Sequence, residues 1–241
     1  MLDFVPFVSP CIALDAGCGT GFPTLELAER LGEGSHVHGI DTSEVFLERA
    51  RFKARTRGVR NVTFEQGDAS ALIFEDDFFD LIVSNLGLNN FTDRDAVIRE
   101  CRRVLKPGAI LALTTNLYGH MSEVYTAFRE TLSALNDAAA LERLEAQERS
   151  RSTAQEGKQQ LAACGFTVLK LERRMLKMRF ANAGAFLGHS FTKQAFLDAW
   201  KDAVEPPRQA ATFAALEERL DRLAVRDGLG LTVPMAYFEA T

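Results

Sequence analysis

A glycine-rich stretch close to the amino terminus, Asp15-Ala16-Gly17-Cys18-Gly19-Thr20-Gly21, has the residue pattern with the clearest chemical meaning. It lies between a short apolar run and a segment with helical spacing, so we expect a turn from a strand into a helix. Glycines allow the backbone to approach a ligand closely, and the free N–H groups of the following helix favour an anionic group. A dinucleotide site needs the spacing G-x-G-x-x-G, and a P-loop needs Lys followed by Ser or Thr. Here the spacing is G-x-G-x-G followed by Phe22, which argues against NAD, FAD and P-loop nucleotides.

Polar residues follow the next three predicted strands at the same edge of the sheet. Asp41 comes 20 residues after Gly21, where a carboxylate can accept hydrogen bonds from two ribose hydroxyls. In Gly67-Asp68-Ala69, the carboxylate can accept from an adenine amino group and the next N–H can donate to the ring. Ser84-Asn85-Leu86-Gly87 ends the fourth strand, where the transferred group should lie. The alternatives are a helix N-cap for Asp41 and an ordinary turn residue for Asp68.

The order of these motifs resembles the class I S-adenosylmethionine-dependent methyltransferases, and within them the small-molecule methyltransferases. Phe79–Val83 and Leu105-Lys106-Pro107-Gly108 extend the resemblance, which covers roughly residues 11–116. It implies S-adenosylmethionine as cofactor, S-adenosylhomocysteine as product, a small-molecule acceptor and the following cofactor contacts. The methionine part would lie against Ala16, Gly17 and Gly19, with Asp15 near its positive groups. Asp41 would hold the ribose, and Thr42, Asp68 and Ala69 would contact the adenine. Asn85 and Leu86 would line the methyl end.

The acceptor side of the reaction has weaker signals. Methyl transfer from a sulfonium depends mainly on positioning, and a general base is needed only if the acceptor keeps its proton at neutral pH. His120, after the fifth strand, is our candidate base; the alternative is a histidine at a helix start, bonded to backbone or solvent. His189 is a second candidate, and we expect His38 to be structural. Five aromatic residues could shape an apolar acceptor pocket or simply pack: Tyr118, Tyr125, Phe128, Phe186 and Phe191.

The elements that must position these residues alternate between strands and helices. Pro23 suits a first helical turn, and Ser43 suits the N-cap of a helix through Arg57 with Phe46, Leu47 and Ala50 facing inward. Thr92 with Asp95 resembles a capping box. This alternation predicts an α/β, Rossmann-like, doubly wound sheet, and the resemblance adds a sixth strand, an antiparallel seventh and a helical insertion before the last strand. The expected strands are Cys11–Ala16, His36–Asp41, Asn61–Glu65, Asp80–Ser84, Ala109–Thr114, Phe166–Glu172 and Leu231–Glu239.

We expect a single methyltransferase domain over residues 1–241. Residues 1–116 form its cofactor-binding half, and residues 117–241 its acceptor side with two helices in a 184–224 insertion split by Glu205-Pro206-Pro207. Only ten residues precede the first strand, where many members of the family that it resembles carry one or two helices that cover the cofactor. Either this chain lacks that lid, a partner subunit supplies it, or the start of the natural protein is missing. The 184–224 insertion could serve as a substitute cap.

Composition limits the other possibilities. A net charge of −5 argues against broad nucleic-acid binding. The sequence contains no run of 18 apolar residues, so we expect no membrane span. Four cysteines without paired spacing indicate free thiols in a reducing cytoplasm, with no metal site. A homodimer is possible. The alternative functions are an RNA- or protein-directed methyltransferase, a non-catalytic module that keeps the fold, and a nucleotide-dependent oxidoreductase.

Overall fold

The computed structural model describes residues 1–224 and 227–241, which form two compact units. The first, here called the sheet unit, comprises Met1–Thr115, Ala154–Arg173 and Ala236–Thr241. The second, the helical unit, comprises Asn116–Thr153 and Arg174–Met235. Each is described by itself below.

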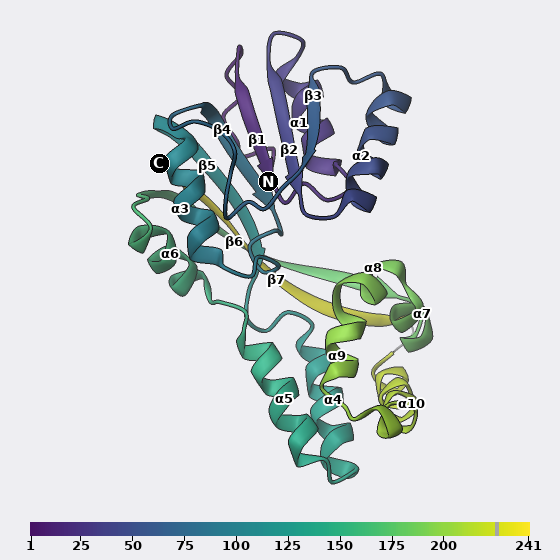
Figure 1. The fold of residues 1–241 in the computed structure, drawn as a ribbon. Coiled ribbons are helices and arrows are strands. Elements are labelled where there is room, and N and C mark those ends of the chain that lie inside the picture. The colour runs from purple at the N-terminus through teal and green to yellow at the C-terminus, as the bar shows by residue number, and fades with distance from the viewer. Residues whose placement is uncertain (225–226) are drawn as a thin grey trace. The chain divides into compact units, whose positions relative to one another are not determined.

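Seven strands form one sheet in the order β3-β2-β1-β4-β5-β7-β6 (Figure 1). The first five strands pair in parallel, while β7 is antiparallel. Thr241, directly after β7, exchanges two backbone hydrogen bonds with Thr167, directly before β6. The predicted Rossmann-like, doubly wound fold is confirmed. The strands are β1 Ile12–Ala16, β2 His36–Asp41, β3 Val62–Gln66, β4 Phe79–Asn85, β5 Leu105–Asn116, β6 Val168–Phe180 and β7 Leu229–Ala240.

The sequence of β1 explains its central place. Ala13, Leu14, Asp15 and Ala16 have no exposed surface, as expected of a strand that is covered on both faces. Its carboxyl end leads into the glycine-rich turn, so the cofactor motifs start from the most buried strand of the sheet.

The helices of the sheet unit are α1 Phe22–Leu31, α2 Glu44–Arg57, α3 Arg94–Val104 and α6 Ala154–Ala163. Pro23 lies in the first turn of α1, and the hydroxyl of Ser43 accepts a hydrogen bond from the Phe46 N–H, as predicted for an N-cap. The inward direction predicted for Phe46 is wrong, because only the face carrying Leu47 and Ala50 packs on the sheet and Phe46 remains exposed.

Three further boundaries differ from the sequence-based expectation. Asp93, not Thr92, caps α3, because its carboxylate accepts a hydrogen bond from the Ala96 N–H at 2.9 Å. Lys106-Pro107-Gly108 does follow the helix, but it lies inside β5, which already starts at Leu105. β6 also runs eight residues beyond Glu172, through a mostly exposed and strongly basic segment that is typical of an edge strand.

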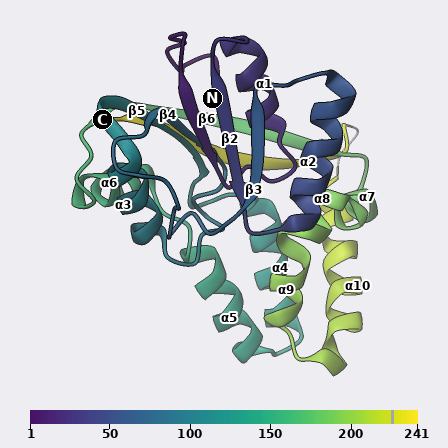
Figure 2. The same cartoon turned by 45° about the horizontal axis from the view of Figure 1, so that its top comes forward.

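The helical unit contains most of the segment predicted as an insertion (Figure 2). The second predicted helix is present, with Pro206 in its first turn, but the first is divided into short pieces that include a π-helical turn. Tyr125, Phe128, Phe186 and Trp200 are buried in the core of this unit. No helix among the residues described is long and apolar enough to cross a membrane. The helices are α4 Ser122–Ala134, α5 Ala138–Arg149, α7 Ala183–Gly188, α8 Ser190–Thr192, η1 Lys193–Leu197, α9 Asp198–Asp202 and α10 Pro206–Leu223.

Candidate functional site

The glycine-rich turn is held against β2 by its own backbone. The N–H groups of Gly17 and Cys18 both donate to the Ile40 carbonyl at 2.9 Å. Gly17 and Gly19 have φ angles of 73° and 53°, in the left-handed region that favours glycine. A Cβ on Gly19 would meet no atom of the described chain within 4 Å. The turn therefore presents open backbone at the carboxyl end of β1, as a ligand cradle requires.

Asp41 connects this turn to the start of α2. One carboxylate oxygen accepts a hydrogen bond from the Gly19 N–H at 2.8 Å, and the other accepts from the Ser43 N–H at 2.9 Å. The N-cap position of α2 belongs to Ser43, so the alternative of a simple capping role does not describe Asp41. A carboxylate with two oxygens still has acceptor capacity after these two bonds. Thr42 beside it is exposed, with its carbonyl bonded to the Gln66 amide.

Asp68 and Ala69 lie just beyond β3 in the same unit. The Gly67 N–H donates to the Asp41 carbonyl at 3.1 Å, which fixes the end of β3 beside the end of β2. The Asp68 carboxylate is exposed and accepts a hydrogen bond from the Ser70 N–H at 2.8 Å, and this bond lowers its pKa. Asp68 therefore makes a contact within its turn, as expected of an ordinary turn residue. Its ionised carboxylate is also exposed and can accept further hydrogen bonds. Ala69 is buried.

Asn85 and Leu86 end β4 in a tightly packed loop. The Thr114 hydroxyl donates to the Asn85 side-chain oxygen at 2.7 Å, and the Leu86 N–H donates to the Thr114 carbonyl at 3.0 Å. Leu86 has a φ of 63°, a backbone conformation that residues other than glycine rarely adopt. The Phe91 ring lies within 3.3 Å of the places that a Cβ would take on Gly17 and on Gly87. The loop after β4 therefore packs directly on the glycine-rich turn.

Asp15 is the most unusual residue of the sheet unit. Its side chain is fully buried, and one oxygen accepts a hydrogen bond from the Thr24 hydroxyl at 2.7 Å. The other oxygen is buried with no hydrogen-bond partner in the described chain. Burial raises the pKa of this carboxyl to about 7. An unpartnered acceptor at the base of an open turn fits a ligand with a positively charged group, such as the ammonium and sulfonium of S-adenosylmethionine.

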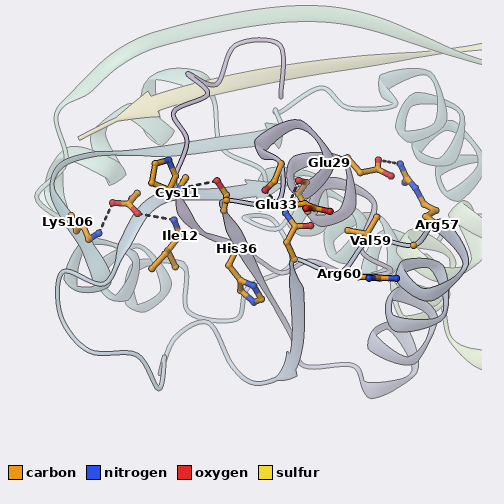
Figure 3. Close-up of a pocket in the computed structure, with 17 residues that line it drawn as sticks. Cys11, Ile12, Glu29, Glu33, His36, Arg57, Val59, Arg60 and Lys106 are labelled. Carbon is orange, nitrogen blue, oxygen red and sulfur yellow. Dashed lines mark hydrogen bonds and ion pairs between the residues drawn. The ribbon is translucent and has the colours of Figure 1, made fainter.

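A separate cavity of about 1290 Å³ lies at the opposite edge of the sheet unit, by the amino ends of its strands (Figure 3). Four of its charged groups are bonded to one another or to the backbone: Asp80 to Lys106 and to the Ile12 N–H, and Arg57 to Glu29. Ligands of open α/β sheets bind at the carboxyl ends of the strands. We therefore assign no ligand to this cavity.

His120 belongs to the helical unit, whereas all ten predicted cofactor residues belong to the sheet unit. The His120 ring is 1% exposed and stacks on Phe196, with centroids 5.5 Å apart. Both ring nitrogens are buried and have no partner among the described residues, so the alternative of a histidine bonded to backbone or solvent does not describe this side chain. Burial, and then the charge of Arg151, lowers its pKa to about 4, so the ring is neutral at pH 7.

The other two histidines considered from the sequence, His189 and His38, have local contacts. Nδ1 of His189 accepts a hydrogen bond from the Phe191 N–H at 3.2 Å and caps α8. His38 lies edge-on to Phe74 and Phe79, with centroids 5.2 and 5.7 Å away.

The sequence analysis overlooked several residues of both units. Thr24, which binds Asp15, has a detectable signal, because it follows the glycine-rich turn in the first turn of a predicted helix. Arg151 and Trp200, which meet at the Tyr125 hydroxyl, have none, because they are far from Tyr125 and from each other in the sequence.

Comparison with known proteins places this site in a family. Residues 8–173, more than half of the chain, match a family model described as a methyltransferase domain. The chain belongs to this family, which confirms the predicted membership in the class I methyltransferase family.

Individual relatives agree with this membership over part of their length. A demethylmenaquinone methyltransferase of Geobacillus stearothermophilus is 40% identical over 121 residues, which cover 48% of this chain and 52% of that protein. This chain therefore spans about half the length of that relative. The YcgJ protein of Bacillus subtilis has the same fold, with a TM-score of 0.63 and 20% identity over 100% of this chain and 95% of that one. The [4+2]-cyclase SpnF also shares it, with a TM-score of 0.60 and 23% identity over 95% and 73% of the two chains.

Proposed function

We propose that this protein transfers the methyl group of S-adenosylmethionine to a small organic molecule. The observation that carries the proposal is the convergence of the glycine-rich turn, Asp41, Asp68 and Asn85 at the carboxyl ends of four adjacent strands. The name of the demethylmenaquinone methyltransferase supports a small-molecule acceptor. The fold by itself would not, because the same fold occurs in a protein described as a cyclase.

In this proposal the sheet unit holds the cofactor. The open backbone at Gly19 lies along the methionine part with Ala16 and Gly17 beside it, and the Asp15 oxygen that has no partner in the described chain faces its positive charge. Asp41 accepts hydrogen bonds from the ribose with the lone pairs that Gly19 and Ser43 leave free. Five more residues complete the cofactor contacts: Thr42, Asp68 and Ala69 for the adenine, and Leu86 with Asn85 for the methyl end.

The sulfonium of the cofactor supplies a good leaving group, so the chain has to hold the acceptor in line and manage its proton. His120 is the proposed general base. Support comes from its neutral ring and from two buried nitrogens without a partner in the described chain. A His120→Gln variant should lower kcat and change its pH profile while cofactor affinity stays the same. Unchanged kcat would remove this role.

The cellular setting is also a proposal, namely a reducing compartment such as the cytoplasm. All four cysteines are free and buried. Burial raises the pKa of the Cys11 thiol to about 11 and that of Cys101 to about 12, so these groups are unreactive thiols. A thiol-labelling experiment on the folded protein should modify none of them quickly.

Calorimetric titration with S-adenosylhomocysteine tests the cofactor site. The wild-type protein should bind it, and Asp41→Asn should weaken binding about tenfold or more, because a charged acceptor is lost. Asp76→Asn is the matched control, since Asp76 is an exposed carboxylate paired with Arg103. Equal affinity of Asp41→Asn and wild type, or no binding to a folded wild-type chain, would contradict the proposal.

A further inference from the structure

The helical unit contains a pocket of about 390 Å³ that the cofactor site does not use. Its walls come from α4, α5, η1 and α9. Figures 1 and 2 show α4, α5 and α9 gathered within this unit. The residues that matter are Tyr125, Gln147, Arg151, Phe196 and Trp200. Ligand pockets span about 300 to 1,000 Å³, so this one suits a molecule of one or two rings.

Two of these residues supply flat apolar walls. The Phe196 and Trp200 rings are nearly parallel, with centroids 5.6 Å apart and an angle of 29° between their planes. Tyr125 meets Trp200 edge-on at 6.2 Å. Aromatic walls in offset or edge-on arrangement favour another planar ring as the ligand.

The charge of the pocket is positive. The Arg151 guanidinium lies over the Phe196 ring, 5.5 Å from its centroid, and one nitrogen donates to the Tyr125 hydroxyl at 3.2 Å. No carboxylate of the described residues pairs with Arg151, whereas Arg149 nearby pairs with Glu145. An arginine held among aromatic rings without a counter-ion is suited to an anionic oxygen.

Several polar atoms here have no partner within the protein that the structure describes. The Tyr125 oxygen accepts from Arg151 and from Trp200 Nε1 at 3.4 Å, which leaves its own hydrogen without an acceptor. Nε of Arg151 and the side-chain oxygen of Gln147 are buried and have no hydrogen-bond partner in the described chain. Buried polar groups are normally bonded, so a donor and an acceptor left unsatisfied at one pocket are suited to bind a polar ligand.

We propose that this pocket binds a planar aromatic carboxylate that also carries a hydroxyl group. The rings of Phe196 and Trp200 hold the aromatic plane, Arg151 and the Tyr125 hydroxyl bind the carboxylate, and Gln147 accepts from the hydroxyl. The proposal does not depend on methyl transfer, because none of these residues is a proposed cofactor contact or the proposed base, and the cofactor contacts all lie in the sheet unit.

Trp200 makes the test specific, since it is the only tryptophan of the chain. The probe is 1-hydroxy-2-naphthoate, and the measurement is quenching of Trp200 fluorescence during titration of the full chain. The neutral methyl ester of the probe is compared with the acid. Wild type should bind the acid about tenfold or more tightly than the ester, because only the acid makes a charge-assisted bond.

Arg151→Gln should lose this preference and bind acid and ester alike, while Arg149→Gln, two residues away on the surface, should keep the wild-type ratio. Equal binding of acid and ester to wild type would overturn the proposal and needs no variant to fold. So would an unchanged ratio in Arg151→Gln or an equal loss in Arg149→Gln. S-adenosylhomocysteine affinity, measured on the same variants, should not change. If wild type did not bind S-adenosylhomocysteine at all, the proposed function would be refuted, but the proposal for this pocket would still stand.

Discussion

Replacing Asp15 by asparagine should stabilise the protein at pH 8 and weaken its cofactor binding. In the folded chain, burial raises the pKa of Asp15 from 3.8 to about 7. A group whose pKa is higher in the folded state stabilises the fold least at high pH, so its contribution is lost as pH rises from about 4 to 7. A shift of about 3 pKa units corresponds to about 4 kcal/mol lost at pH 8. Asparagine has the same shape and no charge to bury.

The gain is smaller than this value, because an asparagine amide left without a partner costs about 1 to 3 kcal/mol. We therefore expect Asp15→Asn to raise the free energy of unfolding by about 1 to 3 kcal/mol at pH 8 and by nearly nothing at pH 5. Urea titrations of both proteins at the two pH values measure the difference, and other titrating groups cancel between them.

Asp80→Asn is the control with the opposite sign. Its carboxylate accepts a hydrogen bond from the Ile12 N–H and pairs with Lys106, and its pKa is lowered despite partial burial. The asparagine variant should be less stable than wild type at both pH values. If Asp15→Asn gains no stability over wild type between pH 5 and pH 8, burial of an ionisable Asp15 is the wrong account. Its S-adenosylhomocysteine affinity at pH 8 should fall about tenfold, as expected for a lost charge-assisted contact.

Three further predictions concern packing, capping and acid stability. Gly87→Ala should cost about 1 to 3 kcal/mol in a urea titration, because its Cβ would lie 2.5 Å from the Ser84 hydroxyl, and an unchanged midpoint would disprove the contact. Asp93→Ala should lose about 1 kcal/mol of stability through its N-cap bond, whereas Thr92→Ala should lose little if Asp93 is the cap. His120→Phe should be less acid-sensitive than wild type. Between pH 7 and pH 5, the histidine is protonated in the unfolded chain, where its pKa is 6.5, but not in the folded one, which should lower the free energy of unfolding of wild type by about 2 kcal/mol. An equal loss of stability in both proteins over this pH range would contradict the low pKa of the buried ring.

The sheet unit was predictable because its signals are local. Buried apolar runs mark the strands, and Pro23 and Ser43 mark helix starts through their own backbone chemistry. The errors occur where local signals compete. Thr92 and Asp93 are both good N-cap residues, and the register of α3 on the sheet decides between them. Phe46 is apolar, but the face of α2 that packs is set by Leu47 and Ala50.

The helical unit was less predictable because its contacts join distant residues. Tyr125 is separated by 26 residues from Arg151 and by 75 from Trp200, and no spacing rule links them. The sequence also does not reveal that one carboxylate oxygen of Asp15 lacks a partner in the described chain, because this results from burial by the surrounding strands and helix. Sequence patterns located the polar residues at the strand ends, whereas the unsatisfied atoms that suggest ligands emerged only from tertiary packing.

Asp41 shows why the choice of substitution decides what an experiment on the cofactor site can reveal. The same carboxylate holds the glycine-rich turn and the start of α2, through Gly19 and Ser43, and is proposed to bind the ribose. Asp41→Ala would remove both the hydrogen bonds that hold the turn and the carboxylate that accepts from the ribose. A loss of affinity in this variant would therefore not separate the two effects. Asp41→Asn keeps one acceptor oxygen for a backbone N–H while it removes the charge. A larger loss of affinity in Asp41→Ala than in Asp41→Asn would measure how far the ready-made shape of the turn, and not the charge alone, contributes to binding.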